Sequence, residues 1–192
     1  DIIYYNKLYR DWKEQGRPIP PPHFVKRKVL RAYAKKFKIK LLIESGTYKG
    51  AMVDEMKSYF ERIISIELGV DLYEKAKLKF DNYENITIIH GDSAEVMPKL
   101  LQELNTPTLF WLDGHFSGGI TAKGKIETPI IQELVAILNH NIKDHVILID
   151  DAREFGNAPD YPSIDELINL IHTYRNDINI KVEDDIIRIT PL

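Results

Sequence analysis

The chain has 192 residues, of which 44% are hydrophobic and 29% charged, and its formal net charge is −3. This length and composition suit one globular domain with its own core, and the negative charge provides no general attraction to nucleic acid or to an anionic membrane. Because the chain contains no cysteine, disulfides, thiol catalysis and zinc–thiolate sites are excluded.

Residues 1–38 are interpreted as an N-terminal extension followed by a helix. The extension is aromatic and basic and ends in three prolines at residues 20–22, which favour an extended connection. Apolar residues at helical spacing predict a helix over about residues 23–37. We expect the N-terminal aromatic side chains to pack on the sheet; the alternative is that they form one wall of a binding site.

Residues 39–192 are interpreted as the core of the domain. Its short apolar runs predict strands buried on both faces, at residues 41–44, 63–67, 86–90, 108–113 and 145–150. Amphipathic stretches between these runs predict helices, one of them with Thr128 as N-cap and Pro129 at its first position, and another opened by a capping box from Ser163 to Glu166. Residues 178–182 and 186–190 predict a terminal hairpin. Strands that alternate with helices imply a parallel sheet with right-handed crossovers.

Acidic side chains stand at nearly every predicted strand end. They are Glu44, Glu67, Asp92, Asp113 and the pair Asp150-Asp151. Ligands of parallel sheets bind beyond the carboxyl ends of the strands, so we expect the functional site at this edge.

Gly46 and Gly50 flank the turn after the first strand, where glycine permits positive φ and close backbone approach. The spacing is not the dinucleotide fingerprint, and two glycines in a turn could be purely structural. Glu67, 21 residues after Gly46, could accept hydrogen bonds from two ribose hydroxyls; the alternative is a solvated strand-end acid. Asp92 could accept from an adenine amino group, could cap the next helix, or could do both, and Ser93 could also cap that helix.

Four segments resemble, in order and spacing, the motifs of class I S-adenosylmethionine-dependent methyltransferases. They are Glu44-x-Gly46-x-x-x-Gly50, Ser65-Ile66-Glu67-Leu68, Gly91-Asp92-Ser93 and Trp111-Leu112-Asp113-Gly114-His115. The resemblance covers roughly residues 40–155. It implies an α/β, Rossmann-like methyltransferase fold with a mostly parallel seven-stranded sheet, helices on both faces and an antiparallel strand in the C-terminal hairpin.

The resemblance also implies which residues surround the methyl donor S-adenosylmethionine. They are Glu44, Ser45, Gly46, Thr47, Tyr48, Gly50, Glu67, Leu68, Gly91, Asp92, Ser93 and Asp113. Glu44 and the glycine turn would lie near the methionine part, Glu67 at the ribose and Asp92 with Ser93 at the adenine. Asp113 would lie near the methionine amino end or the reacting centre.

Asp113, Asp150 and Asp151 follow two strands that should be neighbours. Two carboxylates 4 Å apart repel by about 4 kcal/mol at an effective dielectric near 20, so a proton, a basic side chain such as Arg153 or a divalent cation must offset the charge. The arrangement resembles metal-dependent O-methyltransferases of the catechol and macrocin types, in which such acids hold Mg²⁺. His115 stands where the macrocin type usually carries a second acid, and would take the acceptor proton; the alternative is an ordinary loop histidine. Asp151 could also serve only as a cap.

These observations predict methyl transfer from S-adenosylmethionine to an oxygen of a small sugar-like or phenolic acceptor, with Asp113 and His115 as catalytic residues and Mg²⁺ as an open alternative. A nicotinamide (NAD)-dependent oxidoreductase and a non-catalytic nucleotide-binding module are the rival hypotheses. The loop at residues 116–127 could close over the acceptor; the alternative is a solvated connection. Residues 155–161 are a candidate for a second wall.

No apolar run approaches the roughly 18 residues that span a bilayer. The chain begins at Asp1 rather than Met, which allows for a trimmed upstream segment, and no signal peptide is expected in what remains. We therefore expect a cytoplasmic protein without nucleic-acid or membrane partners, and leave a homodimer open.

Overall fold

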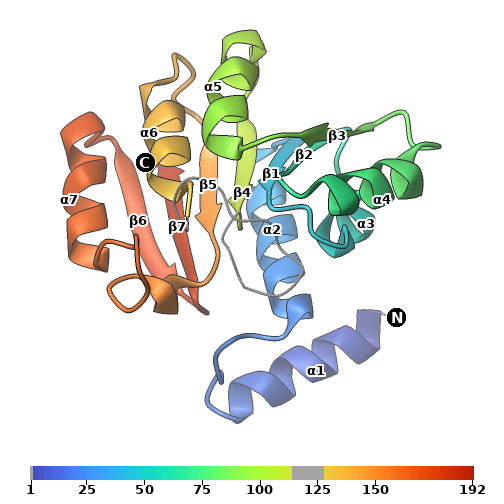
Figure 1. Cartoon of the computed structure of the whole chain (residues 1–192). Coiled ribbons are helices and arrows are strands. Elements are labelled where there is room, and N and C mark those ends of the chain that lie inside the picture. The colour runs from blue at the N-terminus through green and yellow to red at the C-terminus, as the bar shows by residue number, and fades with distance from the viewer. Residues whose placement is uncertain (1, 114–127) are drawn as a thin grey trace.

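The computed structural model describes residues 2–113 and 128–192, which include seven strands joined in one sheet (Figure 1). The strands are β1 (Leu41–Ser45), β2 (Arg62–Glu67), β3 (Ile86–His90), β4 (Thr108–Leu112), β5 (Val146–Ile149), β6 (Ile178–Glu183) and β7 (Ile186–Pro191). Their spatial order is β3-β2-β1-β4-β5-β7-β6. All the predicted strands are present, and the predicted mostly parallel seven-stranded sheet is confirmed.

The pairing pattern brings the carboxyl ends of five strands to one edge. β1 pairs in parallel with β2 and β4, β2 with β3, and β4 with β5. β7 runs antiparallel to β5 and forms the expected hairpin with β6. The order reverses direction between β1 and β4, where open α/β sheets leave a crevice for ligands.

Helices cover both faces, as predicted, and divide the core into two clusters. One cluster packs α2 (His23–Phe37), α3 (Ala51–Met56) and α4 (Val70–Phe80) against the sheet. The other packs α5 (Ser93–Glu103), α6 (Ile130–Asn139) and α7 (Ile164–Tyr174) against its opposite face. Leu42 of β1 belongs to the first cluster and its neighbours Leu41 and Ile43 to the second, as the alternation of a strand requires.

The predicted start of α7 is confirmed, and that of α6 is displaced by one residue. Ser163 and Glu166 form the predicted capping box at the start of α7. The prediction for α6 was wrong by one residue: its N-cap is Pro129, and the Thr128 hydroxyl accepts from the amide of Ile130 over 3.3 Å. Thr128 therefore still satisfies one amide of the first turn, although it precedes the cap.

β3 departs from the prediction that every core strand is buried on both faces. Its residues are half-buried or exposed, because β3 is an edge strand of the sheet. The apolar run alone could not distinguish an edge strand from a central one.

The N-terminal segment also differs from the prediction, because residues Ile2–Glu14 form a helix, α1, that stands apart from the sheet beside the start of α2 (Figure 1). The ring of Tyr5 lies 6.4 Å from that of Phe24, and Lys28 lies 4.1 Å from the ring centre of Tyr9. Tyr5 and Tyr9 therefore contact α2 rather than the sheet. No helix in the described ranges has both the length and the apolar character to cross a membrane.

Candidate active site

The strand-end acids do gather at one edge of the sheet. Glu44, Glu67 and Asp113 are close enough for the charges of the last two to raise the pKa of Glu44. One oxygen from each of Asp113, Asp150 and Asp151 lies within 4.8 Å of the others. The prediction that these carboxylates share an edge is thus confirmed, and they divide into a group near β1 and β2 and a group near β4 and β5.

The turn after β1 has the backbone that its glycines predict. Gly46 has φ +87° and Gly50 has φ +68°, both in the left-handed region. Tyr48 also lies in that region at φ +50°. The amides of Gly46 and Thr47 donate to the carbonyl of Ile66 in β2, which fixes the turn against the neighbouring strand.

Glu67 is held rigidly beside this turn. Its two carboxylate oxygens accept from the backbone amides of Tyr48 (2.7 Å) and Gly69 (2.8 Å). The residue is only 5% exposed. Because each carboxylate oxygen can accept more than one hydrogen bond, Glu67 is oriented in advance and keeps acceptor capacity for a ligand.

A buried polar chain connects the turn to Glu44. The Thr47 and Ser65 hydroxyls lie 2.6 Å apart, and the Ser65 hydroxyl donates to Glu44 over 2.5 Å. Burial raises the pKa of Glu44 to about 8, and the Ser65 hydrogen bond only partly opposes this effect. Glu44 is therefore largely protonated in the folded chain near neutral pH.

The raised pKa gives a stability prediction. Between its ordinary pKa of 4.5 and about 8, Glu44 binds more protons folded than unfolded, so its contribution to stability falls as pH rises through that window. Glu44→Gln removes this dependence, so the variant should gain about 1 kcal/mol per pH unit relative to the wild type across the window. Urea unfolding of both proteins at several pH values measures the difference. Parallel stability curves would show that Glu44 is ionised in the fold.

The segment after β3 caps a helix. Asp92 is the N-cap of α5 and accepts from the amide of Ala94 over 3.0 Å, whereas Ser93 is the first helical residue rather than the cap. The capping role of Asp92 is thus observed, and its adenine contact remains a prediction.

A buried acid near this segment was not predicted from the sequence. Glu133 on α6 is fully buried, and its two oxygens make no hydrogen bond among the described residues. Burial raises its pKa to about 7, while the nearby hydroxyls of Ser93 and Ser45 lower it and Asp92 raises it. The one available signal was an acidic residue among the apolar positions of an amphipathic helix.

The second acidic group lies where β4 and β5 end. Burial and the charges of Asp113 and Asp151 raise the pKa of Asp150 to about 7. Asp151 has φ +54°, a conformation that Asp tolerates better than most residues, and its amide donates to Asp150 over 2.9 Å. Strained backbone of this kind is concentrated at functional sites.

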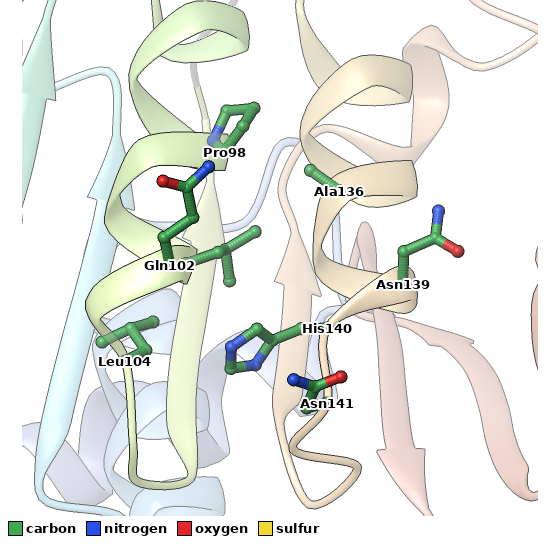
Figure 2. Close-up of a pocket in the computed structure, with 8 residues that line it drawn as sticks. Pro98, Gln102, Leu104, Ala136, Asn139, His140 and Asn141 are labelled. Atoms are coloured by element: carbon green, nitrogen blue, oxygen red, sulfur yellow. The ribbon is translucent and has the colours of Figure 1, made fainter.

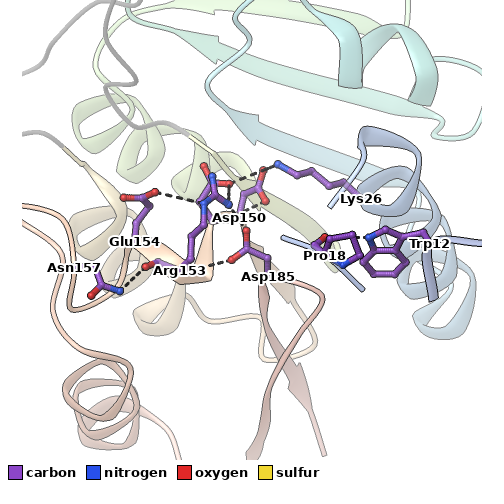
Figure 3. Close-up of polar contacts among 9 residues, drawn as sticks. Trp12, Pro18, Lys26, Asp150, Arg153, Glu154, Asn157 and Asp185 are labelled. Atoms are coloured by element: carbon purple, nitrogen blue, oxygen red, sulfur yellow. Dashed lines mark hydrogen bonds and ion pairs between the residues drawn. The ribbon is translucent and has the colours of Figure 1, made fainter. Parts of the chain in front are cut away.

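Two cationic side chains contact the acids at the ends of β4 and β5. Arg153 was predicted as a partner, but Lys26 was not. Lys26 of α2 forms a hydrogen-bonded ion pair with Asp150, and its Nζ lies 3.6 Å from Asp151 (Figure 3). Arg153 donates to Asp151 over 2.9 Å and pairs with Asp185. The predicted Arg153 ion pair is therefore present, but Lys26 is the residue that neutralises Asp150.

In ligand type, Asp113, Asp150 and Asp151 suit a hard divalent cation. The carboxylates of Asp150 and Asp151 already contact Lys26, and that of Asp151 also contacts Arg153. A divalent ion would have to displace Lys26 to bind all three acids, so the residues as arranged do not fit Mg²⁺.

Several predicted residues lie outside or beside this group. His115 and the loop at 116–127 are not among the described residues. Leu68 is half-buried, and its carbonyl lies 3.1 Å from Nε2 of His90. Phe155 is buried and its ring meets that of Tyr161 edge-on, so part of the predicted second wall belongs to the core.

A groove of about 360 Å³ lies between the ends of α5 and α6, lined in part by Gln102 and His140 (Figure 2). α5 starts at Ser93 on the acidic edge and runs away from it to Glu103. The groove therefore lies at the far end of α5, away from the acidic edge of the sheet.

Comparison with solved structures identifies the fold. The O-methyltransferase from Bacillus cereus, solved in complex with SAH, superimposes with a TM-score of 0.66 at 13% identity over 98% of this chain and 90% of that one. The O-methyltransferase TomG from Streptomyces achromogenes, solved with SAM, gives 0.63 at 16% identity over 98% and 88%. The chain has the fold of the class I S-adenosylmethionine-dependent methyltransferases. This fold was the one implied by the sequence motifs.

The similarity in sequence to known proteins covers less of the chain than the similarity in structure. No protein-family model matches the chain. The ribosomal RNA small subunit methyltransferase A of Mycoplasma capricolum is 39% identical over 64 residues, which are 33% of this chain and 24% of that protein. Its counterpart from Caldanaerobacter subterraneus is 20% identical over 119 residues, 60% and 44% of the two chains. The chain thus spans less than half the length of these two relatives.

Proposed function

We propose that the chain transfers a methyl group from S-adenosylmethionine to a hydroxyl oxygen of a small acceptor. The observation that carries the proposal is Glu67, whose carboxylate is fixed by the amides of Tyr48 and Gly69 beside the glycine turn. An acid oriented in this way at the end of the second strand suits two ribose hydroxyls. In this proposal the methionine part of the donor lies over Glu44 and Gly46, and the adenine lies near Asp92 and Ser93.

The acceptor end of the proposed site is the group formed by Asp113, Asp150 and Asp151. In the transfer, the acceptor oxygen bonds to the donor methyl carbon, the carbon–sulfur bond breaks with its electron pair kept by sulfur, and the hydroxyl proton passes to a base. Asp113 lies between the two acidic groups, which suits a role in orienting that hydroxyl. His115 is two residues further on and is proposed as the base, since a histidine titrates near neutral pH.

The test measures S-adenosylhomocysteine formed from S-adenosylmethionine with phenolic, sugar and RNA acceptors. Transfer to a phenol or a sugar is expected, and Asp113→Asn should lower the rate by at least about 100-fold, because misplacing the reacting hydroxyl has a cost in that range. Asp81→Asn, an exposed acid at the end of α4, is the control and should leave the rate unchanged. A full rate for Asp113→Asn would remove Asp113 from the reacting centre.

RNA is a second candidate acceptor. Two sequence relatives are named as ribosomal RNA methyltransferases, and residues 1–40 carry twelve Lys and Arg against three Asp and Glu. Such an imbalance provides the electrostatic attraction that phosphate backbones require. Transfer to RNA alone in the acceptor test would replace the small-molecule proposal.

A further inference from the structure

Lys26 is the cation at the acceptor end of the site. It lies on α2, 124 residues before its partner Asp150, and reaches across to the carboxyl ends of β4 and β5 (Figure 3). Its side chain is 15% exposed and that of Asp150 is 1% exposed. Burial lowers the pKa of Lys26, but Asp150, Asp113 and Asp151 together raise it above the ordinary value, so the ammonium stays charged.

Lys26 and a metal ion would compete for the same acids. A divalent ion bound by Asp113, Asp150 and Asp151 would need the carboxylates of Asp150 and Asp151, which Lys26 already contacts. An ammonium and a divalent cation on shared ligands would also repel each other strongly in a partly desolvated site. The two cations are therefore alternatives.

The other charges around Lys26 do not replace it. Arg153 contacts Asp151 and Asp185, and Arg27, on the same helix as Lys26, pairs with Glu55. The imidazole of His23 is a further neighbour, and burial together with Arg27 and Lys26 lowers its pKa. Among the described residues, Lys26 is the one cation that donates a hydrogen bond to Asp150.

We propose that the ammonium of Lys26 takes the place of a divalent metal at this site, so that the folded chain excludes divalent cations from Asp113, Asp150 and Asp151. This proposal adds to the proposed methyl transfer. It rests on that function only in taking Asp113, Asp150 and Asp151 as the place where the acceptor binds. Lys26 is then a positioning residue that holds the two acids for the acceptor hydroxyl. Helix α2 thereby contributes a residue to the active site.

The experiment titrates Mn²⁺ into the full chain near neutral pH and follows the electron paramagnetic resonance signal of the free ion. The wild type should leave the signal of free Mn²⁺ unchanged. Lys26→Met, which removes the charge and keeps much of the volume, should bind one Mn²⁺ at least about tenfold more tightly than the wild type, since a unit charge near the site is gone. Mn²⁺ should also raise the melting temperature of Lys26→Met and not that of the wild type.

Three further variants locate the effect. Lys28→Met, on the same helix but placed over the ring of Tyr9, should behave like the wild type. Lys26→Arg keeps the charge and should exclude Mn²⁺. Adding Asp150→Asn to Lys26→Met should abolish the gained binding. Lys26→Gln, which can still donate to Asp150, replaces Lys26→Met if the latter does not fold.

Two results would overturn the proposal. One is a folded Lys26→Met or Lys26→Gln protein that gains no Mn²⁺ binding. The other is a wild type that binds one Mn²⁺ and loses it in Asp150→Asn, a comparison that needs no change at Lys26. The measurement uses no methyl donor, so its outcome is separate from a failure of S-adenosylhomocysteine to bind.

Discussion

Glu67→Ala is expected to weaken binding of S-adenosylhomocysteine by at least about 100-fold. Two ribose hydroxyls donating to a carboxylate contribute roughly 1.5–3 kcal/mol each, and the substitution removes both bonds. It also leaves the amides of Tyr48 and Gly69 without their present acceptor, so the donor turn loses its anchor. Isothermal titration calorimetry of the wild type and the variant measures the change directly.

Two further variants separate charge from position. Glu67→Gln keeps an acceptor oxygen and the shape of the side chain but has no charge, so it should fall between the wild type and Glu67→Ala. Glu61→Ala changes an exposed acid just before the other end of the same strand, paired with Lys40, and should leave affinity unchanged. Equal affinity for the wild type and Glu67→Ala would remove the proposed ribose contact.

Gly50→Ala is expected to destabilise the fold by about 3 kcal/mol. A Cβ at this position would stand 2.6 Å from Cε2 and 3.0 Å from Cζ of Phe80, a buried ring that cannot move freely. The left-handed φ of +68° adds a backbone cost of its own. Urea unfolding measures the loss, and donor affinity should fall as well because Gly50 ends the turn.

Gly16→Ala is the matched control, because Gly16 has φ +84° and no atom within 4 Å of the added Cβ. It should cost about 1 kcal/mol, the backbone part alone. The difference between the two variants then measures the contact with Phe80, and Phe80→Leu should reduce it. Equal losses at Gly16 and Gly50 would contradict this assignment.

The arrangement of the sheet was predictable because its signals are local. Short apolar runs separated by amphipathic stretches predict parallel strands and crossover helices, and acids at the ends of those strands must share an edge. Glu67, Asp113 and the pair Asp150-Asp151 were assigned to the correct edge on this basis alone. Their roles toward a donor and an acceptor stay predictions.

Features that depend on distant contacts were not predictable. Lys26 stands beside the buried positions Val25 and Val29 of α2, and no sequence pattern indicates that its side chain turns toward Asp150. The same holds for α1, whose Tyr5 and Tyr9 contact α2, and for β3, whose exposure depends on its place in the strand order. The burial of Glu133 likewise depends on a distant contact, because its side chain lies near Ser93 of α5 and Ser45 of β1.

Calorimetric titration of the wild-type chain with S-adenosylhomocysteine measures whether this edge of the sheet binds the methyl donor. We expect one equivalent to bind with a dissociation constant in the micromolar range, which corresponds to a binding free energy of about −8 kcal/mol. If no binding is detected at about millimolar ligand, where a free energy near −4 kcal/mol would suffice, this edge is not the donor site.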